Sequence, residues 1–549
     1  MVNFLNALVA TAACVGTVSA QLSGPVGPVT SSSSEEASKI CNILDFGGIV
    51  STETDNHDAI LRAWGACAAG GQVYIPEGDY GLASWLLLKH GNGTSINLEG
   101  TIYRTGSGGG NMILIRDSTD IEIYSANSKG AIQGYGYEFH KQGGYGPRIM
   151  RLYHVSNFSI HDITLVDSPA FHLSLDSCEN GEIYNIVIRG GNKGGLDGLD
   201  VWSSNIWIHD VEVTNKDECV TVKTPSDHIL VERIHCNWSG GSAMGSLGTN
   251  VSVHDIEYRD SYTHHAHQMY LIKSNGGCGN VYNIAFHNFI GHSNAYSFDL
   301  DSAWTQLALQ DGDGISFSNI TISSWSGMAS NAAQRGPIKI HYPAGVPCTG
   351  ITVRDFDIGT ETGNAILYSS QNAYGSGACL QEGTAYVQFS STQTISTLPS
   401  TNYATKMAGE LSTGLGLTAS IAIPTIPASF FPGKLPISAI LGSFRDAKTS
   451  RAGTSSETIP VLTPSSTLIL TVSRDASATS STSGTEADQD RVTQTSSFSH
   501  IGNSTTSTVV VIMTPLPTGS SSKDVASENL SSRSLRPSCG GRHSHHHRH

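Results

Sequence analysis

Residues 194–219 read GGLDGLDVWSSNIWIHDVEVTNKDEC, and the alternation within this stretch decides the fold. Apolar residues occupy every second position over 206–208 and again over 211–213, which is the pattern of two short β-strands. Acidic residues stand on both sides of these strands: Asp197, Asp200, Asp217 and Glu218. If each repeat of this kind is one turn of a coil, acids about twenty residues apart come to lie side by side.

The double-strand pattern recurs from about residue 96 to residue 358, with no long helical pattern between the strands. Corresponding positions step through 158, 183, 206, 229 and 251, at intervals of 25, 23, 23 and 22 residues. Repeats of this length made of strands and turns predict an all-β fold, a right-handed parallel β-helix. The Leu and Asn framework of leucine-rich repeats is absent, and a β-propeller needs repeats of about 40–50 residues.

Composition predicts what lies outside the coil. Residues 1–20 contain an apolar run that ends in small residues, which indicates a removed signal peptide and therefore secretion. Residues 21–40 are rich in Ser, Pro and Gly and are expected to form a flexible linker. The catalytic β-helix domain is expected over 41–390, with a short helix near 52–71 covering one end of its core. Residues 391–549 are expected to be a disordered Ser/Thr-rich tail.

The charge balance limits the classes of partner. The net charge is −15 at pH 7, which argues against nucleic acid because phosphate binding relies on clustered Lys and Arg. No later stretch approaches the roughly 20 apolar residues of a membrane helix. An anionic sugar polymer remains compatible with this charge if local cations line a cleft. We expect a monomer that binds such a polymer, and neither nucleic acid nor a membrane.

Export places the cysteines in an oxidising compartment, where disulfides persist. We expect the disulfides Cys41–Cys67 and Cys219–Cys236, and consider Cys348–Cys379 as a third pair. The sequence leaves open the pairing of Cys178, Cys278 and Cys539. No C-x-x-C pair occurs, so a zinc site of that kind is not expected. Candidate glycosylation sequons are Asn92, Asn157, Asn237, Asn250 and Asn319.

Four short blocks resemble the β-helical polygalacturonase family of glycoside hydrolases (family 28). That family carries Asn-Thr-Asp, Asp-Asp, Gly-His-Gly and Arg-Ile-Lys in this order, and the matching blocks here are GLD (195–197), DEC (217–219), SGG (239–241) and LIK (271–273). The acids and the Lys are present, whereas the Asn-Thr, the His and the Arg are absent. This variant set is similar to the rhamnogalacturonan hydrolase branch of the family. The resemblance covers roughly residues 41 to 385.

The resemblance implies roles for the acids in an inverting hydrolysis, with a water molecule between acid and base. Asp217 matches the family's general acid, and Asp197 and Glu218 match the residues that activate water. The adjacency of Asp217 and Glu218 leaves Glu218 as the alternative proton donor. Two ionised neighbours predict a raised pKa for Asp217. For Asp200 alone we favour a turn residue that faces solvent.

The resemblance also implies a substrate-binding role for Lys273, which would hold a galacturonate carboxylate by charge. Leu271, in place of the family's Arg, predicts a more apolar neighbouring subsite that suits the methyl group of rhamnose. His292 is the best substitute for the missing His, although a lone His is more often structural. Tyr270 and Tyr296, together with Trp304, are candidate sugar-stacking residues, for which packing is an equally good interpretation.

No metal or cofactor is expected, because hydrolysis of this kind requires none. The cluster of His264, His265 and His267 has no other metal ligands nearby in the sequence. The prediction is a secreted endo-hydrolase that cleaves galacturonic acid–rhamnose linkages in the rhamnogalacturonan backbone of pectin. The alternatives are a polygalacturonase, a pectin lyase and a non-catalytic β-helical carbohydrate-binding protein.

Overall fold

A computed structural model describes residues 22–330, 336–363, 365–383, 387–395, 406–407 and 409–442. The expected signal peptide and residues 443–549 of the expected tail lie outside these ranges. Within these ranges no helix is both long and apolar enough to cross a membrane. The helices are α1 (Ser32–Ser38), the 3₁₀ helix η1 (Ile43–Phe46), α2 (His57–Cys67) and α3 (Tyr137–His140).

The strands follow one another with few helices between them. The first thirteen are β1 (Ile40–Asn42), β2 (Ser51–Asp55), β3 (Gln72–Ile75), β4 (Asp79–Leu82), β5 (Leu86–Lys89), β6 (Asn92–Leu98), β7 (Thr101–Arg104), β8 (Asn111–Tyr124), β9 (Ala131–Gln133), β10 (Arg148–His161), β11 (Thr164–Val166), β12 (Leu173–Arg189) and β13 (Leu199–Thr214). The others are β14 (Glu218–Val222), β15 (Ser226–Asn237), β16 (Gly241–Leu247), β17 (Val251–His264), β18 (Tyr270–Ser274), β19 (Gly279–Asn294), β20 (Phe298–Asp301), β21 (Ser316–Ala329), β22 (Ile338–His341), β23 (Cys348–Thr360), β24 (Ile366–Gln371), β25 (Ala373–Ser376) and β26 (Ser390–Ile395).

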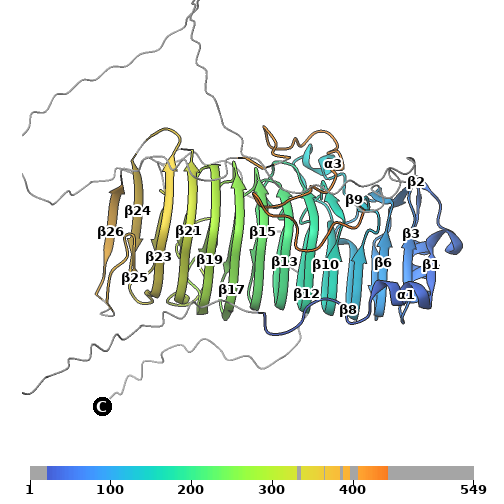
Figure 1. Cartoon of the computed structure of the whole chain (residues 1–549), viewed down its shortest axis with the longest axis horizontal. Helices are drawn as coiled ribbons and strands as arrows, with labels where there is room; N and C mark the ends of the chain where they lie inside the picture. The colour runs from blue at the N-terminus through green and yellow to red at the C-terminus, as the bar shows by residue number, and fades with distance from the viewer. Residues whose placement is uncertain are drawn as a thin grey trace, which may run out of the picture. The chain divides into compact units, whose positions relative to one another are not determined.

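These strands form the predicted parallel β-helix. Each long strand pairs in parallel with its equivalent in the next turn, as β13 does with β15 and β15 with β17. Figure 1 shows the strands side by side in chain order, from blue at the N-terminal end to yellow at the C-terminal end. Among the named strands only β26 pairs antiparallel, with β24. The chain therefore reverses direction at the last strand of the coil.

Apolar side chains stack inside the coil to form its core. Ile160, Ile183, Ile208, Val231 and Tyr258 occupy equivalent positions in five successive turns, and each is fully buried. Period-2 alternation places every second side chain of a strand in this interior, and the intervening ones face outward. Burial of each such apolar side chain is worth about 1.5–3 kcal/mol. The interior column is therefore the main source of stability.

The predicted register is right for the step from Ile206 to Ile229, but positions 183 and 251 were misaligned, and Ile183 pairs with Ile208 rather than Ile206. The position equivalent to Phe158 in the next turn is Gly181 rather than Ile183, and the position equivalent to Ile229 is Ile256 rather than Val251. A shift of two residues keeps a side chain on the same face, so the alternation alone does not detect the first error. The second error arises because Val251 begins β17 ahead of Val253, the first residue of β17 that pairs with β15.

The expected helix near residues 52–71 is α2, at the N-terminal end of the coil. Its residues Ile60, Trp64 and Cys67 are buried, and Cys67 forms the expected disulfide with Cys41 of β1. The indole nitrogen of Trp64 donates a hydrogen bond to the carbonyl of Lys89, at a distance of 3.0 Å. The prediction that a short helix covers one end of the core is confirmed.

The expected linker over residues 21–40 is ordered where the structure describes it. The backbone N–H groups of Val29 and Thr30 donate to the carboxylate of Asp120, and Ser23 N–H donates to the side chain of Asn205. Helix α1 follows and lies against β6 and β3. The Ser-rich composition predicted flexibility, but these backbone groups find acceptors on the outer face of the coil.

Part of the expected tail also packs on the coil, which corrects the boundary at residue 390. β26 extends the sheet, and residues 409–442, which we call the C-terminal segment, run along one side of the turns. The Trp238 indole donates to Leu411 O at 2.8 Å, Gln133 donates to Ile421 O at 2.8 Å, and Ile437 N–H donates to Asp210 at 2.9 Å. Figure 1 draws this segment in orange. Its buried residues are Ile421, Phe430 and Phe431.

The cysteines and sequons only partly follow the expectations. Cys219–Cys236 is formed as expected, whereas Cys348 and Cys379 are buried free thiols, so that third pair is wrong. Cys178 is likewise a buried free thiol, and Cys278 is disulfide-bonded. Among the sequons, Asn92 and Asn250 are exposed, and Asn157 and Asn319 are half-buried.

Asn237 is the sequon that the fold excludes. Its side chain is fully buried, and its Oδ1 lies 3.1 Å from Nδ1 of His264. A glycan is a bulky solvated group that needs a surface position. The expectation of a glycan on Asn237 is therefore wrong for the folded chain.

Glu35 makes the stability of the fold depend on pH. Its side chain on α1 is 1% exposed, and burial, with the nearby carboxylates of Glu122 and Asp120, raises its pKa to about 7. Since the folded pKa exceeds the unfolded one, this stabilisation is complete below pH 4.5 and is lost as pH rises through 7. We expect Glu35→Gln to stabilise the protein by about 2–3 kcal/mol at pH 8 and to change little at pH 4.5. Thermal unfolding at the two pH values measures this, and an equal effect at both would contradict it.

Candidate active site

The three acids singled out in the sequence converge at one place on the outer face of the coil. One carboxylate oxygen from each of Asp197, Asp217 and Glu218 lies within 4.8 Å of the others. Asp197 stands just before β13, and Glu218 is the first residue of β14. These strands pair with Leu199 opposite Val220, which brings the two segments onto neighbouring turns. Asp197 and Glu218 are buried, and Asp217 is half-buried.

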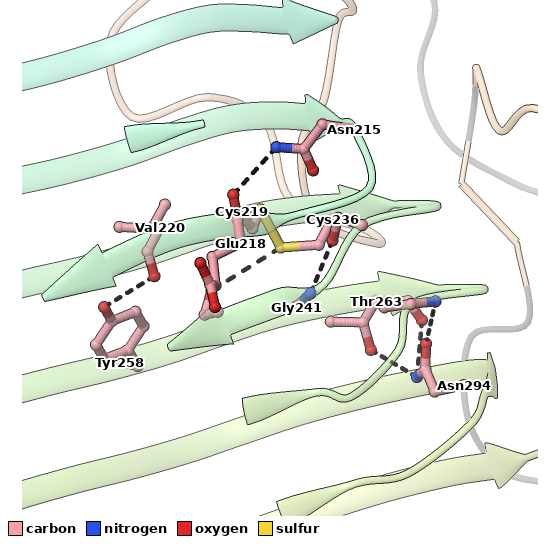
Figure 2. Close-up of a disulfide and its surroundings, with 12 residues drawn as sticks. Asn215, Glu218, Cys219, Val220, Cys236, Gly241, Tyr258, Thr263 and Asn294 are labelled. Atoms are coloured by element: carbon pink, nitrogen blue, oxygen red, sulfur yellow. Dashed lines mark hydrogen bonds between the residues drawn. A yellow bond between two sulfur atoms is a disulfide. The ribbon is translucent and has the colours of Figure 1, made fainter. Parts of the chain in front are cut away.

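A disulfide and an asparagine hold this acidic turn. Cys219 directly follows Glu218 and bonds to Cys236 at the end of β15, as Figure 2 shows. Asn215 donates to Leu196 O at 2.7 Å and to Glu218 O at 3.1 Å, so one buried amide ties together the segments that carry Asp197 and Glu218. The sequence analysis missed Asn215, although its position two residues before the Asp-Glu pair was a possible signal.

The electrostatic environment separates the three acids. Burial raises the pKa of Glu218 to about 7, with a further rise from Asp217, while Lys273 opposes the shift. Burial also raises the pKa of Asp197 well above its usual value, and the surrounding carboxylates of Asp200, Asp217 and Glu218 add to the rise. Three clustered carboxylates cannot all ionise without strong mutual repulsion. The site therefore holds protons at pH values where isolated carboxyl groups have lost them.

Asp217 differs from the prediction of a raised pKa. Burial raises its pKa, but a hydrogen bond with Glu218, the N–H groups of Gly195 and Glu218 and the charge of Lys273 outweigh burial and lower it. Backbone donors stabilise the ionised carboxylate because they supply positive dipoles without solvent. In the free site Asp217 is therefore the anionic member of the pair, and Glu218 is the member that holds a proton.

Two lysines balance the acidic charge. Lys273 Nζ contacts Glu218 Oε1 directly, so the predicted substrate-binding Lys lies beside the acids. Lys223 was missed by the sequence analysis; its Nζ lies 3.1 Å from Asp200 Oδ1 and 3.7 Å from Asp197 Oδ2. It follows β14 by one residue and meets acids of the neighbouring turn, so no local spacing in the sequence reveals the pair.

Gly240 and Gly241 occupy the place of the family's Gly-His-Gly block because backbone packing leaves no room for a side chain. Gly240 N–H donates to Asp217 O at 2.7 Å. A Cβ on Gly240 would lie 2.9 Å from the carbonyl carbon of Asp217, and one on Gly241 would lie 1.8 Å from Gln268 O. Gly241 also has a φ of +84°, a left-handed conformation that favours glycine. This glycine pair therefore packs its backbone closely against the acidic turn.

Three expectations for individual residues are wrong. Asp200 does not face solvent; it is fully buried and paired with Lys223. Tyr270 is fully buried, with its ring 4.2 Å from that of Phe286 between centroids, so it is a core residue and not a sugar-stacking one. Leu271 is 2% exposed and offers almost no surface to the methyl group of rhamnose.

The remaining candidates lie on later turns. A ring nitrogen of His292 lies 3.1 Å from Ser293 Oγ, and its ring stacks on that of His264 with centroids 5.5 Å apart. Within the described residues no hydrogen bond joins His292 to the three acids. Tyr296 packs edge-on against His267 and is 9% exposed. The assigned roles of His292 and Tyr296 stay predictions.

The amino-acid sequence matches known proteins over most of its length. The profile of Glycosyl hydrolases family 28 matches residues 68–377. Rhamnogalacturonase A of Emericella nidulans is 54% identical over 449 residues, which are 81% of this chain and 89% of that protein. Rhamnogalacturonase A of Aspergillus aculeatus is 55% identical over 425 residues, which are 77% of this chain and 97% of that protein.

A solved structure shares the architecture. The endo-xylogalacturonan hydrolase from Aspergillus tubingensis aligns with a TM-score of 0.55 and 23% sequence identity, covering 63% of this chain and all of that one. At this identity the likeness concerns the fold, which is the parallel coil described above.

Proposed function

The chain belongs to family 28 of the glycosyl hydrolases, and from that premise we propose that it is a secreted, endo-acting enzyme that cleaves galacturonic acid–rhamnose linkages in rhamnogalacturonan I. The observation that supports this proposal most directly is the convergence of Asp197, Asp217 and Glu218 within 4.8 Å beside Lys273. Glycosidic hydrolysis needs one protonated and one ionised carboxyl group, and this cluster supplies both. The relatives of more than 50% identity are rhamnogalacturonases, which favours this substrate over plain polygalacturonan.

In this mechanism the Asp217–Glu218 pair delivers a proton to the leaving oxygen. The pair shares a hydrogen bond, and the raised pKa of Glu218, about 7, keeps one proton on it in mildly acidic solution. The family resemblance assigns the donor role to Asp217, with Glu218 as the residue from which the shared proton comes. Asp197, with the ionised member of the pair, holds and activates the attacking water.

Lys273 and Lys223 neutralise the acids and attract the substrate. Lys273 lies next to Glu218 with 16% of its side chain exposed, so a galacturonate carboxylate can reach its ammonium group. An ammonium group binds a carboxylate by charge, without the bidentate geometry of Arg. This arrangement supports the proposal that an acidic sugar binds beside the cleaved bond.

We assign inversion of configuration to the reaction. Inverting glycosidases usually separate their two carboxyl groups by about 6.5–9.5 Å and retaining ones by about 5–5.5 Å. The closest oxygens here lie within 4.8 Å, which by itself resembles the retaining geometry. The third carboxylate changes that comparison, because two acids can hold a water between them while the other protonates the leaving oxygen. Inversion therefore requires all three acids.

Digestion of saponified rhamnogalacturonan I and of polygalacturonic acid, with NMR of the fresh products, tests the proposal. We expect new reducing ends from rhamnogalacturonan alone, with the anomeric configuration opposite to that of the cleaved bond, and a fast fall in polymer length. Retained configuration would overturn the inverting assignment, and a slow release of single sugars would overturn the endo assignment.

The rival functions give different products. Cleavage of polygalacturonic acid alone would make the protein a polygalacturonase, and unsaturated ends that absorb in the ultraviolet would make it a lyase. Measurable binding to rhamnogalacturonan with no cleavage would leave a carbohydrate-binding protein. Recovery of the chain from culture medium without residues 1–20 checks secretion.

The pKa of Glu218 predicts how activity depends on pH. Since catalysis needs one proton on the Asp217–Glu218 pair, kcat/KM should fall about tenfold per pH unit above about pH 7. Lys273→Met removes a charge that lowers the pKa of Glu218, so the alkaline limb should move to higher pH. Initial rates from pH 3 to 9 for both proteins measure this. An alkaline limb that stays in place in the variant would contradict the assignment.

A further inference from the structure

A column of outward side chains runs along one corner of the coil and contains none of the catalytic acids. Each of its residues has a left-handed backbone, with φ between 52° and 58°. Strand register places them at the same position of seven successive turns: Asn157, Asn180, Asn205, His228, Asp255, Asn283 and Asn319. Asn tolerates this conformation better than other residues with a side chain, which explains its frequency here.

Side-chain hydrogen bonds connect this column from both ends. Asn205 donates to Asn180 at 2.8 Å, and Asn180 donates to Asn157 at 3.1 Å. From the other end, Asn319 donates to Asn283 at 2.8 Å, and Asn283 donates to Oδ1 of Asp255 at 2.9 Å. One run of amides therefore stops at Asn205, next to His228 in the column, and the other ends on Asp255.

His228 and Asp255 do not bond to each other. Nε2 of His228 lies 3.8 Å from Oδ2 of Asp255, beyond hydrogen-bond range. Nδ1 of His254, the residue before Asp255, lies 2.8 Å from the same oxygen. All three ligand atoms lie within 4.8 Å of one another. A tetrahedral zinc ion with bonds of about 2.0–2.1 Å separates its ligand atoms by about 3.3 Å, so small side-chain rotations suffice.

Neighbouring residues orient the side chains of His228 and Asp255 as binding of a cation would require. Asp227 Oδ1 lies 2.7 Å from Nδ1 of His228 and accepts its proton, which leaves the lone pair of Nε2 directed toward Asp255. Ser204 donates to the same Asp227 oxygen at 2.7 Å. Metal-binding histidines are typically fixed by such a carboxylate on the other ring nitrogen. Asn283 fixes the carboxylate of Asp255 in the same way.

We propose that His228, His254 and Asp255 bind a divalent cation of borderline softness, of which Zn²⁺ is the representative, with water completing its coordination. Two imidazoles and one carboxylate suit Zn²⁺ better than Ca²⁺ or Mg²⁺, which prefer oxygen ligands alone. The side chains are 24–31% exposed, so an ion can enter from solvent. Bound at this corner, the cation joins β15, which carries His228, to β17, which carries His254 and Asp255.

Calorimetric titration of the full-length protein with ZnCl₂ at pH 7.5 tests the proposal. The terminal histidines (His543, His545, His546, His547 and His549) also bind zinc, so the background protein has these five replaced by Ser. We expect one equivalent of zinc in this background, proton release on binding and a rise in Tm that EDTA reverses. His228→Ala should abolish that equivalent, and Asp227→Asn should weaken it about 10–100-fold.

His57→Ala is the matched control, because His57 and Asp58 form an adjacent His–Asp pair, 3.0 Å apart, without a second imidazole in the group. The His57→Ala variant should still bind one equivalent of zinc. Circular dichroism and Tm of each metal-free variant establish that it folds. Absence of binding in the folded background protein would overturn the proposal. Zinc binding that survives His228→Ala would also overturn it, since the ion would then occupy another site, such as the catalytic acids.

Discussion

Replacing Asp217 by Asn should lower kcat on rhamnogalacturonan by a factor of about 10³ or more, while substrate binding changes little. A positioned acid–base residue contributes about 10²–10⁴ to the rate, and the variant cannot transfer the proton of the Asp217–Glu218 pair. Asn keeps the size of the side chain, and its oxygen can still accept from Gly195 N–H. Initial rates, together with the Kd of the polymer, separate turnover from binding.

The control for this variant is Asp58→Asn, an exposed acid of α2 whose side chain is 76% accessible. It should retain full activity and the same Tm. The kcat of Glu218→Gln should fall as the kcat of Asp217→Asn does, because either change removes the acid pair. Wild-type turnover in Asp217→Asn would exclude Asp217 from the chemistry and leave Glu218 as the donor. Wild-type turnover in both variants would refute the proposed site.

Removal of the C-terminal segment should destabilise the protein strongly and slow catalysis. The segment buries Ile421, Phe430 and Phe431, and burial of each such side chain is worth about 1.5–3 kcal/mol before ordering entropy is subtracted. It also accepts, at Leu415 O, a 2.9 Å hydrogen bond from Asn192 N–H. The loop that begins at Asn192 supplies the Gly195 N–H that holds Asp217. We therefore expect a loss in both Tm and kcat.

The informative comparison is between a chain that ends at residue 442 and one that ends at residue 408. Both lack the residues after 442, so their difference isolates the segment. We expect Tm to differ by about 5 °C or more, since each kcal/mol shifts Tm by a few degrees. Equal Tm values would show that the contacts of the segment contribute no net stability. A lower Tm with unchanged kcat would show that it stabilises the coil without positioning Asp217.

The interior of the fold was predictable because alternation reports directly on burial. Inward-facing Ile and Val residues recur in the repeated strands, so the β-helix and the order of its strands follow from the pattern, whereas the register between turns does not. The segments that pack outside the coil gave no such signal. Residues 22–38 and 409–442 make backbone hydrogen bonds to Asp120, Asp210 and similar acceptors, which leave no periodic trace in the sequence.

The acids of the site were predictable, whereas their electrostatic partners were not. Asp197, Asp217 and Glu218 stand in recognisable blocks, but the pairing of Lys223 with Asp200 depends on which residues of two turns meet. Tyr270 illustrates a signal that was present and unused. It precedes Lys273 by three residues in one strand, and an odd spacing places two side chains on opposite faces. Since Lys273 points outward to Glu218, Tyr270 must face the core.

The reversal at β26 fixes how far the coil can grow. A parallel coil has no natural last turn, because each edge strand offers the next chain the same unsatisfied N–H and C=O groups. β26 runs against β24 along six paired residues, from Ile366 opposite Ile395 to Gln371 opposite Ser390. A further turn that ran parallel to β24 would have to pair antiparallel with β26, so the parallel repeat of the coil does not continue past this strand. The antiparallel strand thus acts as a terminator that discourages end-to-end polymerisation into fibres.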